Sequence, residues 1–378
     1  MIAKCQLVYI KTFGCQMNEH DSERVRDLLS GRGYRLADKP EDADVILFNT
    51  CSVREHAEDR VYGKVGGFEK LKKTRPDLII GILGCMAEAR KDLIFRKLPH
   101  VDFLCGPADL DRVPGIIDKI KNGAGHIMCL GGHESGRLPE FSENRCPGNN
   151  VYVKIIEGCN NFCSYCVVPY VRGRERSRPS KEILDEVRRL IEKGAGEITL
   201  LGQNVNSYGR GLKEKIDFVG LLKKIDRIAS GAKIGFVTSH PKDAGVELFR
   251  AMRDLKSISK NLHLPMQSGS DKILKRMNRG YSSEKYKKLV EDFRRMVKEG
   301  TITTDIIVGF PGETKKDFED TLEAIREIEF DAAYIFKYSP RPFAAANKLK
   351  DDVPMEEKER RHAVILETQK EISRKKCR

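Results

Sequence analysis

The chain opens with short apolar runs separated by polar, helix-like stretches. Leu7–Phe13 is rich in β-branched and aromatic residues and predicts a strand, and a polar helix follows around Asp21–Leu29, where two glycines end it. Apolar runs at 45–48, 78–83 and 101–104 predict three more strands. Because strands that alternate with helices are typical of a doubly wound parallel sheet, we predict an α/β fold for this first segment.

The second part of the chain repeats the strand–helix pattern six times. We expect strands to begin near Val151, Glu197, Lys233, Asn261, Thr301 and Asp331, and helices at Lys181–Glu192, Val246–Leu255 and Thr314–Ile328. Thr314 followed by Asp317 fits a capping box at the start of the last of these helices. Six strand–helix units are too few for a closed eight-stranded barrel. The pattern therefore predicts an open partial (β/α)6 barrel with its chemistry at the carboxyl ends of the strands.

A glycine-rich, irregular stretch separates the two patterns and sets the expected domain limits. We expect a first domain at 1–122, a linker at 123–145, a core domain at 146–354 and a C-terminal helix at 355–378. Residues 356–376 are highly charged with sparse apolar positions. Such a helix is expected either to be exposed on several sides or to lead into a further domain.

Charge and cysteine content narrow the functional classes. The 378 residues include 69 Lys and Arg against 56 Asp and Glu, a net charge of +13. This excess favours an anionic partner, nucleic acid before membrane, although a solvated basic surface is equally compatible with it. The chain has 11 cysteines, an amino-terminal stretch without the apolar core of a signal peptide, and no apolar run of membrane-spanning length. We therefore expect a cytoplasmic protein, a monomer with no membrane association, in which clustered cysteines bind metal.

The most distinctive chemistry is the loop Gly158–Cys166. Cys159, Cys163 and Cys166 follow a β-branched run with the spacing C-x3-C-x2-C, and Tyr165 precedes the last of them. Three thiolates can hold a 4Fe–4S cluster and leave one iron open for another ligand. The spacing and the aromatic residue are those of the radical S-adenosylmethionine (SAM) enzymes, in which the open iron takes the amino and carboxylate groups of SAM. The alternative is a zinc site or a structural thiol cluster.

Three cysteines of the first segment occupy equivalent positions. Cys15, Cys51 and Cys85 each follow one of the first three predicted strands, and ligands bind outside the carboxyl ends of strands in open α/β sheets. We expect them to converge on one crevice. Cys105 also ends a predicted strand and competes for the same role. Each cysteine could instead be a small buried residue at a strand end.

Polar residues follow the other strands of the second segment. Gln203, Asn204, Ser239, Gln267 and Asp305 lie at or near predicted strand ends, where they would share one rim and could hold a cofactor. For any one of them, a loop or cap role is the ordinary alternative. His240 and His263 could serve as acid–base groups or be hydrogen-bonded structural residues.

A run of arginines follows the three-cysteine loop directly. Residues 172–178 contain four arginines, and the planar guanidinium fork matches phosphate geometry. We expect Arg172, Arg174 and Arg176 to contact the backbone of an RNA substrate; the alternative is a solvated loop.

Long motifs resemble the methylthiotransferase family of radical SAM enzymes. The resemblance runs from about Tyr9 to Lys370 and is strongest at 12–18, 49–55, 84–87, 157–178, 200–206, 263–271 and 339–342. Within the family, the motifs at 15–18 and 49–54 are most similar to the branch that modifies N6-isopentenyladenosine beside the anticodon of tRNA. Rival branches act on threonylcarbamoyl-adenosine in tRNA or on a ribosomal-protein aspartate. A catalytically silent iron–sulfur protein that binds RNA is the alternative outside enzymes.

The resemblance implies two 4Fe–4S clusters with different roles in the reaction. Cys15, Cys51 and Cys85, without Cys105, would bind an auxiliary cluster, and Cys159, Cys163 and Cys166 would bind the cluster that generates the radical. One SAM would methylate sulfur held at the auxiliary cluster, and a second would be cleaved reductively. The 5′-deoxyadenosyl radical would then remove hydrogen from C2 of the adenine, where a methylthio group replaces it. Flavodoxin or ferredoxin is the implied electron donor. Family members continue into a small RNA-binding TRAM barrel, which we expect this chain to lack.

Overall fold

The computed structural model describes residues 6–52, 55–132 and 150–376 and divides the chain into two compact units. Unit 1 comprises residues 1–146 together with 167–174, and unit 2 comprises 147–166 and 175–378. The short helix α7 (Val168–Val171) therefore belongs to unit 1, although its neighbours in the sequence belong to unit 2. No helix in the described part of the chain is long and apolar enough to cross a membrane.

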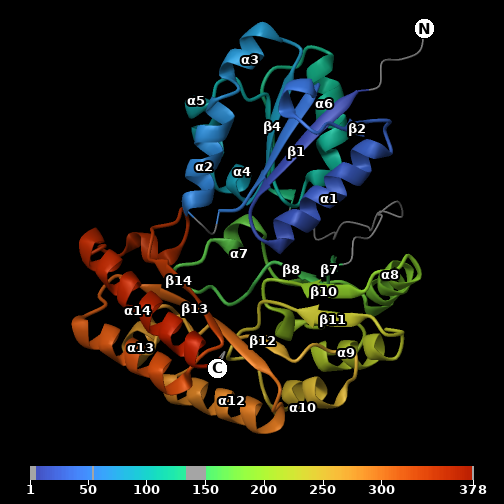
Figure 1. The fold of residues 1–378 in the computed structure, drawn as a ribbon. Coiled ribbons are helices and arrows are strands. Elements are labelled where there is room, and N and C mark those ends of the chain that lie inside the picture. The colour runs from blue at the N-terminus through green and yellow to red at the C-terminus, as the bar shows by residue number, and fades with distance from the viewer. Residues whose placement is uncertain (1–5, 53–54, 133–149, 377–378) are drawn as a thin grey trace. The chain divides into compact units, whose positions relative to one another are not determined.

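Unit 1 is a six-stranded parallel sheet, as the alternating pattern predicts. Its strands lie in the order β2-β1-β3-β4-β5-β6, and every neighbouring pair is parallel (Figure 1). The strands are β1 (Leu7–Phe13), β2 (Arg35–Leu36), β3 (Val45–Thr50), β4 (Ile79–Gly84), β5 (Phe103–Cys105) and β6 (Ile127–Cys129). The helices are α1 (Gln16–Ser30), α2 (Glu55–Gly66), α3 (Glu69–Thr74), α4 (Cys85–Arg90), α5 (Asp92–Lys97) and α6 (Val113–Lys121), with 3-10 turns η1 (Pro40–Asp42) and η2 (Leu110–Arg112).

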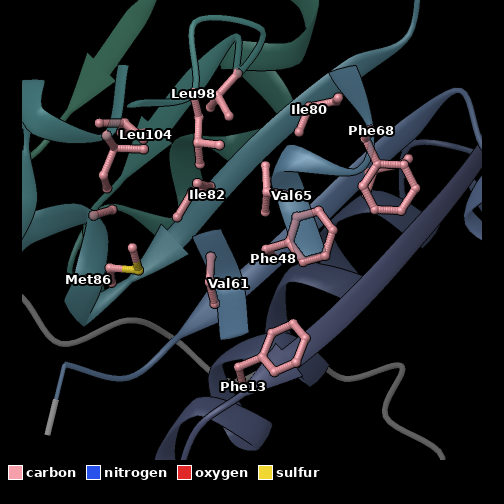
Figure 2. Packing of buried hydrophobic residues seen from close by; sticks show 14 of the residues in the cluster. Phe13, Phe48, Val61, Val65, Phe68, Ile80, Ile82, Met86, Leu98 and Leu104 are labelled. Atoms are coloured by element: carbon pink, nitrogen blue, oxygen red, sulfur yellow. The ribbon is translucent and has the colours of Figure 1, made fainter. Parts of the chain in front are cut away.

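Alternation along β3 explains why both faces of this sheet are buried. Ile46 and Phe48 point to the side covered by α2, α4 and α5, where Phe48 packs beside Val61, Val65 and Phe68 (Figure 2). The intervening residues of the strand point to the opposite side, which α1 and α6 cover. β3 is buried at every position, which requires a layer of helices on each face of the sheet, and this is the doubly wound arrangement.

Part of the stretch 123–145, which we expected to be a linker, forms the last strand of the unit 1 sheet. Its residues Ile127–Cys129 form β6 beside β5, with Cys105 opposite Cys129. Three residues are too few for a periodic pattern, so this strand could not be predicted from the pattern of apolar positions. The rest of the expected linker, 133–145, lies outside the described residues.

Unit 2 contains the six parallel strands of the predicted partial barrel. These are β7 (Asn150–Lys154), β10 (Glu197–Leu201), β11 (Lys233–Phe236), β12 (Asn261–His263), β13 (Thr301–Val308) and β14 (Ala332–Lys337). They form two three-stranded sheets, β7-β10-β11 and β12-β13-β14. Hydrogen bonds from Ile234 N to Ser257 O and from Ser259 N to Ile234 O, both 2.8 Å, join β11 to the segment before β12. The six strands thus follow one another in chain order.

Helices follow the strands of unit 2, and a hairpin precedes the first of them. The helices are α8 (Ser180–Glu192), α9 (Phe218–Asp226), α10 (Val246–Asp254), α11 (Asp271–Arg276), α12 (Ser283–Met296), α13 (Lys315–Ile328) and α14 (Met355–Lys376), with 3-10 turns η4 (Val205–Ser207) and η5 (Ala345–Lys348). The hairpin pairs β8 (Ile156–Glu157) with β9 (Arg176–Ser177). The capping box predicted for α13 is present: Thr314 accepts from Asp317 N, and Asp317 accepts from Thr314 N.

The C-terminal helix α14 packs one stripe against unit 2, and residues on its other sides are exposed. Its buried stripe is largely polar: Lys358, Arg361, Ile365, Gln369 and Ile372. Arg361 pairs at 2.8 Å with Glu313, and Gln369 Nε2 donates to the Phe330 carbonyl at 2.8 Å. Because charged residues occupy the buried face, a hydrophobic pattern could not reveal it.

The Arg361–Glu313 pair gives a stability prediction. Both side chains are buried, so Arg361→Ala leaves an uncompensated carboxylate and should cost about 3–5 kcal/mol. Native-state hydrogen exchange of the α13 and α14 amides measures this local free energy of opening. The matched control is Arg360→Ala, whose side chain is 53% exposed and should cost less than about 0.5 kcal/mol. Equal effects of the two substitutions would contradict the role of the buried pair.

Candidate metal centres and cofactor site

The cysteines of the first segment lie where the topology of unit 1 changes direction. Cys15 follows β1 as the N-cap of α1, Cys51 follows β3, and Cys85 opens α4 after β4. In the order β2-β1-β3-β4, the chain leaves β1 and β3 in opposite directions, so Cys15 and Cys51 flank the topological switch point. Open α/β sheets bind ligands at this point.

Two buried asparagines hold the loops that carry Cys15 and Cys51. Asn49 Nδ2 donates to Asn18 O at 2.8 Å and to Ser22 Oγ at 3.0 Å, while Asn18 Nδ2 donates to Asn49 Oδ1 at 3.2 Å. The backbone N–H of Cys15 donates to Asn18 Oδ1 at 3.3 Å. A Cβ on Gly84 would lie 2.4 Å from Asn49 Oδ1, so the β4 end also fits closely around the amide.

The three sulfurs influence one another. A hydrogen bond from the Cys51 thiol, aided by the positive charge of Arg172, lowers the pKa of Cys15 to about 6 against the opposing effect of burial. Burial raises the pKa of Cys85, and the charge of a Cys15 thiolate raises it further. Cys15 therefore lies beside Cys51 and near Cys85, while Cys105 lies two strands away from Cys51 and stands opposite Cys129 in the sheet.

Arg172 is buried inside unit 1, which conflicts with its expected contact with RNA. The residue is 3% exposed; its Nε donates to Cys85 Sγ at 3.3 Å, and its Nη2 donates to Asp21 Oδ2 at 2.7 Å. It comes from the segment 167–174, where Val167 and Val171 pack beside Cys85 and Ala89. A guanidinium in this position faces thiol sulfur and a carboxylate, not a solvent-exposed phosphate. Arg174 is exposed, and Arg176 is half-buried with its Nη2 4.0 Å from Glu157.

The loop with Cys159, Cys163 and Cys166 is the end of the β8–β9 hairpin of unit 2. Its backbone enters through Gly158, whose φ is 78° and whose N–H donates to Gln203 Oε1 at 2.6 Å. Phe162 has a φ of 47°, a conformation that is costly for a bulky residue. Cys166 N donates to Cys163 O at 2.9 Å, which tightens the turn between these two cysteines.

The turn after α11 fixes the shape of this loop. Ser164 N and Oγ donate to the carbonyls of Met277 and Arg276 at 2.9 and 2.7 Å. The amide of Asn278 donates to the carbonyls of Asn161 and Phe162 at 3.2 and 3.0 Å. These contacts stabilise the positive φ of Phe162.

Arg279, the next residue of that turn, is a buried cation against a cysteine sulfur. Its Nη1 donates to Cys163 Sγ at 3.3 Å and to Tyr165 OH at 3.2 Å, and its Nη2 donates to the Pro265 carbonyl at 3.0 Å. None of the ion pairs in the described part of the chain includes Arg279. A buried charge without a counter-charge is strongly unfavourable, so Arg279 suits a site that carries negative charge when it is occupied. Thiolate ligands of a bound metal centre would supply that charge.

His240 is a second buried side chain near the sulfur of Cys163. Its Nε2 is 4.0 Å from Cys163 Sγ, and its Nδ1 accepts from Lys242 N at 3.2 Å. Burial, together with the charges of Arg279 and Lys242, lowers the pKa of His240 to about 2. The imidazole is therefore neutral, which favours a structural role over proton transfer at neutral pH.

Three of the polar residues expected on the rim have buried side-chain oxygens without a hydrogen-bond partner among the described residues. These atoms are Asn204 Oδ1, Ser239 Oγ and Gln267 Oε1. Gln267 also has a φ of 69° and is held there by backbone hydrogen bonds to Asp305 and Ile307 of β13. Unpartnered buried oxygens and a strained backbone are typical of a binding site for a polar ligand. Gln203, in contrast, is already engaged by Gly158.

Asp305 and His263 lie on the face of β12 and β13 that the helices leave accessible. His263 Nε2 is 3.4 Å from Asp305 Oδ2, and His263 Nδ1 is 2.9 Å from Thr303 Oγ1. Tyr334 lies opposite Asp305 on β14, with its ring centroid 6.0 Å from that of His263. This polar row could contact a ligand within the arc of strands.

Sequence reasoning missed several residues of both centres: Asn18, Asn49, Asn278 and Arg279. Asn18 and Asn49 lie inside motifs that resemble those of the methylthiotransferase family, but we assigned no structural role to either residue. Asn278 has a φ of 56° and Gly280 a φ of 69°, so an Asn-x-Gly signal for a left-handed turn was present after α11. Nothing in the sequence indicated which arginine is buried.

No group of three or more His, Cys, Asp or Glu side chains in the described residues is arranged to bind a single metal ion. The donors at both centres are nevertheless thiols, and each set has one buried guanidinium on a cysteine sulfur. Soft thiolate ligands with hydrogen bonds to sulfur suit iron–sulfur clusters. The residues present therefore fit such a group.

Comparisons with known proteins identify the family. The model of the Radical SAM superfamily matches residues 153–325, and that of Uncharacterized protein family UPF0004 matches residues 7–106. The tRNA-2-methylthio-N(6)-dimethylallyladenosine synthase of Clostridium novyi (strain NT) is 46% identical over 370 residues, which are 97% of this chain and 82% of that protein. The synthase of that name from Caldicellulosiruptor saccharolyticus is also 46% identical, over 99% of this chain and 80% of its own length. The chain belongs to the tRNA-2-methylthio-N(6)-dimethylallyladenosine synthase family.

Solved structures of lower identity share the fold. The radical SAM methyltransferase TsrM from Kitasatospora setae, with cobalamin and an iron–sulfur cluster bound, superposes with a TM-score of 0.67 at 12% identity, covering 90% of this chain and 77% of that one. The cobalamin-dependent radical SAM enzyme OxsB gives a TM-score of 0.56 at 11% identity, covering 98% and 56%. Membership of the radical SAM superfamily implies one 4Fe–4S cluster and SAM for this family.

Arg279 gives a prediction for that cluster. A hydrogen bond from a charged donor is worth about 1.5–3 kcal/mol, and it would favour the more negative, reduced state of a cluster if Cys163 is one of its ligands. Arg279→Met should therefore lower the midpoint potential by about 60–130 mV, since about 59 mV corresponds to tenfold for one electron. Redox titration followed by electron paramagnetic resonance, with Cys15, Cys51 and Cys85 replaced by Ala, isolates this cluster.

Two further variants show whether a change in midpoint potential comes from the charge and position of Arg279. Arg279→Lys keeps the charge and should shift it less than Arg279→Met. Lys275→Met removes an exposed charge of the adjoining helix α11 and should leave it unchanged. A midpoint potential of Arg279→Met within error of the parent would exclude the proposed contact of Arg279 with the bound cluster.

Proposed function

We propose that this protein adds a methylthio group at C2 of N6-isopentenyladenosine, also called N(6)-dimethylallyladenosine, next to the anticodon of tRNA. The observation that carries the proposal is the pair of thiol centres, each with three cysteines and a buried arginine, in a chain 46% identical over 97% of its length to a named synthase. The relatives' names favour this substrate over threonylcarbamoyl-adenosine or a ribosomal-protein aspartate.

The proposal includes two 4Fe–4S clusters. Cys159, Cys163 and Cys166 would hold one, which when bound supplies an electron to SAM and gives access to the 5′-deoxyadenosyl radical. Cys15, Cys51 and Cys85 would hold the other, where sulfur is methylated for transfer. A flavodoxin or ferredoxin would supply the electrons. We propose a monomer in the cytoplasm.

The chain's own residues would perform three tasks at the radical centre. Gln203, Asn278 and the backbone around Met277 hold the cysteine loop open in one conformation. Arg279 and the neutral His240 lie on Cys163, where they would exclude water and balance its charge. Asn204, Ser239, Gln267 and Asp305 supply the polar atoms that would orient SAM.

Arg174 and Arg176 remain the candidates for RNA contact within the arginine run. Arg174 is exposed, whereas the guanidinium nitrogens of Arg176 are buried and have no hydrogen-bond partner among the described residues, so RNA contact would require this side chain to turn outward. Arg172 would act on the auxiliary centre through Cys85 and Asp21, so we do not propose it as a phosphate ligand.

The two-cluster proposal predicts a stoichiometric loss of iron. Replacing Cys159, Cys163 and Cys166 with Ala should halve the iron of reconstituted protein and abolish SAM cleavage, because the other three cysteines lie in a separate unit. Iron analysis and chromatography of 5′-deoxyadenosine measure the two effects. Iron content equal to that of the parent would refute the ligand assignment.

Cleavage and sulfur transfer should separate in the complementary variant. With Cys15, Cys51 and Cys85 replaced by Ala, the protein should still form 5′-deoxyadenosine and yield no methylthio nucleoside. Mass spectrometry of nucleosides from tRNA incubated with each variant tests this. Methylthio product from the triple variant would show that sulfur is held elsewhere.

Salt dependence distinguishes the arginines. Each phosphate contact that is lost lowers the slope of log K against log salt by about 1, so Arg174→Ala and Arg176→Ala should flatten the slope for tRNA binding by about 1 each. Binding isotherms at several salt concentrations measure it. The control variant is Arg172→Met. It should leave the slope of log K against log salt unchanged, because the Arg172 side chain is buried against Cys85 and Asp21. A slope that responds to Arg172 alone would reverse these roles.

A further inference from the structure

A second pair of cysteines lies at the carboxyl edge of the unit 1 sheet. Cys105 ends β5 and Cys129 ends β6, and the parallel register places them directly opposite each other. The Cys105 thiol lies close enough to lower the pKa of Cys129, and its Sγ lies 3.7 Å from the carbonyl oxygen of Gly106. Neighbouring strands lie about 4.8 Å apart, which falls within the Cα separations of about 4.4–6.8 Å that disulfides span. The two sulfurs could therefore join without movement of the backbone.

The environments of the two thiols differ. Cys105 is fully buried, and burial raises its pKa well above the usual value. Cys129 is half-buried, and Arg112 Nη1 donates to its sulfur at 3.6 Å. The hydrogen bond from Cys105, followed by that from Arg112, lowers the pKa of Cys129 to about 7. The pair thus consists of an accessible thiolate backed by a protonated thiol.

The surroundings of Cys129 are held in place by a network of their own. Arg112 Nε lies 3.6 Å from Asp109 Oδ1, and Asp109 Oδ2 accepts from Gly132 N at 2.9 Å. Gly131 N donates to Glu88 Oε2 at 3.1 Å, and Gly106 N donates to the Cys129 carbonyl at 2.8 Å. The thiolate is therefore presented on a fixed strand end.

Packing alone does not account for this arrangement. A cysteine that serves as a small apolar residue is buried and protonated, as Cys105 is, and needs no cation at its sulfur. An accessible, electropositive thiolate next to a second thiol is the arrangement of a nucleophilic cysteine with a resolving partner. Two thiols also fall short of the four ligands that a structural zinc ion takes.

We propose that Cys129 accepts the outer sulfur of a perthiol and that Cys105 resolves the product. In the first step, the Cys129 thiolate attacks the terminal sulfur of R–S–SH, which gives Cys129–S–SH and the thiolate RS⁻. In the second step, Cys105 attacks the inner sulfur of Cys129, a disulfide forms, and the terminal sulfur leaves as hydrogen sulfide with the Cys105 proton. The transferred sulfur is reduced by two electrons while the two thiols are oxidised. A dithiol reductant would restore the pair.

The position of the pair suggests what the sulfide is for. Cys15, Cys51, Cys85, Cys105 and Cys129 follow five of the strands of one parallel sheet and so share its carboxyl edge. Sulfide released there would supply the sulfur that the auxiliary centre transfers. This last step rests on the proposed function, whereas the reaction of the thiol pair does not.

The test uses full-length, cluster-reconstituted protein and glutathione persulfide as the probe. After brief exposure, removal of the probe and alkylation, peptide mass spectrometry should find the parent protein with a disulfide between Cys105 and Cys129. Cys105→Ala keeps a small apolar side chain and should trap one extra sulfur on Cys129. Cys129→Ser should show neither product. Sulfide release should be about one per chain in the parent and absent from both variants.

Arg112, which donates to the sulfur of Cys129, provides a variant that leaves both cysteines in place. In the Cys105→Ala background, Arg112→Ala should slow sulfur transfer to Cys129 at neutral pH, because loss of the guanidinium raises the thiol pKa and each unit of pKa lowers the thiolate fraction about tenfold. The matched variant is Arg96→Ala, exposed on α5, which should react at the parent rate.

The proposal is overturned if Cys129 remains unmodified, if the extra sulfur is distributed over other cysteines to the same extent, or if Cys129→Ser releases sulfide like the parent. Each of these results leaves the methylthio nucleoside assay unaffected, since that assay reports the proposed function separately. Normal tRNA modification with an unreactive Cys129 would therefore refute the thiol pair alone.

Discussion

Each unit of this protein buries one guanidinium against a cysteine sulfur, and the rest of each centre depends on that contact. Arg172 donates to Cys85 in unit 1, and Arg279 donates to Cys163 in unit 2. A buried cation is tolerated only where negative charge can balance it, so both positions suit a centre that carries negative charge when a metal is bound. Three thiolates in one place would repel one another unless a metal centre and nearby positive charge neutralise them. Arg172 and Arg279 provide positive charge from the protein side of each centre.

The two contacts are built differently because the local folds differ. In unit 1 the cysteines stand at strand ends of a sheet whose loops are joined by Asn18 and Asn49, so the arginine has to come from a distant segment, 167–174. In unit 2 all three cysteines lie in one loop, and a single turn after α11 supplies both the amide that fixes the loop and the arginine. Asp21 shares Arg172 with Cys85, whereas none of the described ion pairs includes Arg279. Arg279 is therefore the more dependent of the two on its sulfur partner.

The sequence predicted elements whose signal is local and failed where partners are distant. The strands of both units and the α13 capping box follow from apolar runs and from one Thr-x-x-Asp spacing, which are properties of neighbouring residues. The convergence of Cys15, Cys51 and Cys85 followed from their equivalent positions in three strand–helix units. The burial of Arg172 could not be predicted, because exposed and buried arginines look alike until their partners are known. The same reason hid the packed face of α14, whose stripe contains Lys358 and Arg361.

The open arc of unit 2 explains why a six-stranded arrangement suits a cofactor site. A closed eight-stranded barrel fills its interior with layers of bulky apolar side chains. Along β13 the residues at 302, 304, 306 and 308 are buried, while the alternate row stays half-exposed and includes Thr303 and Asp305. His263 and Tyr334 continue this polar row onto the neighbouring strands. Such a row would be costly inside a closed core, since its polar groups would lose water without gaining enough partners. With fewer strands the row remains accessible, and its unsatisfied hydrogen-bonding capacity is left for a ligand.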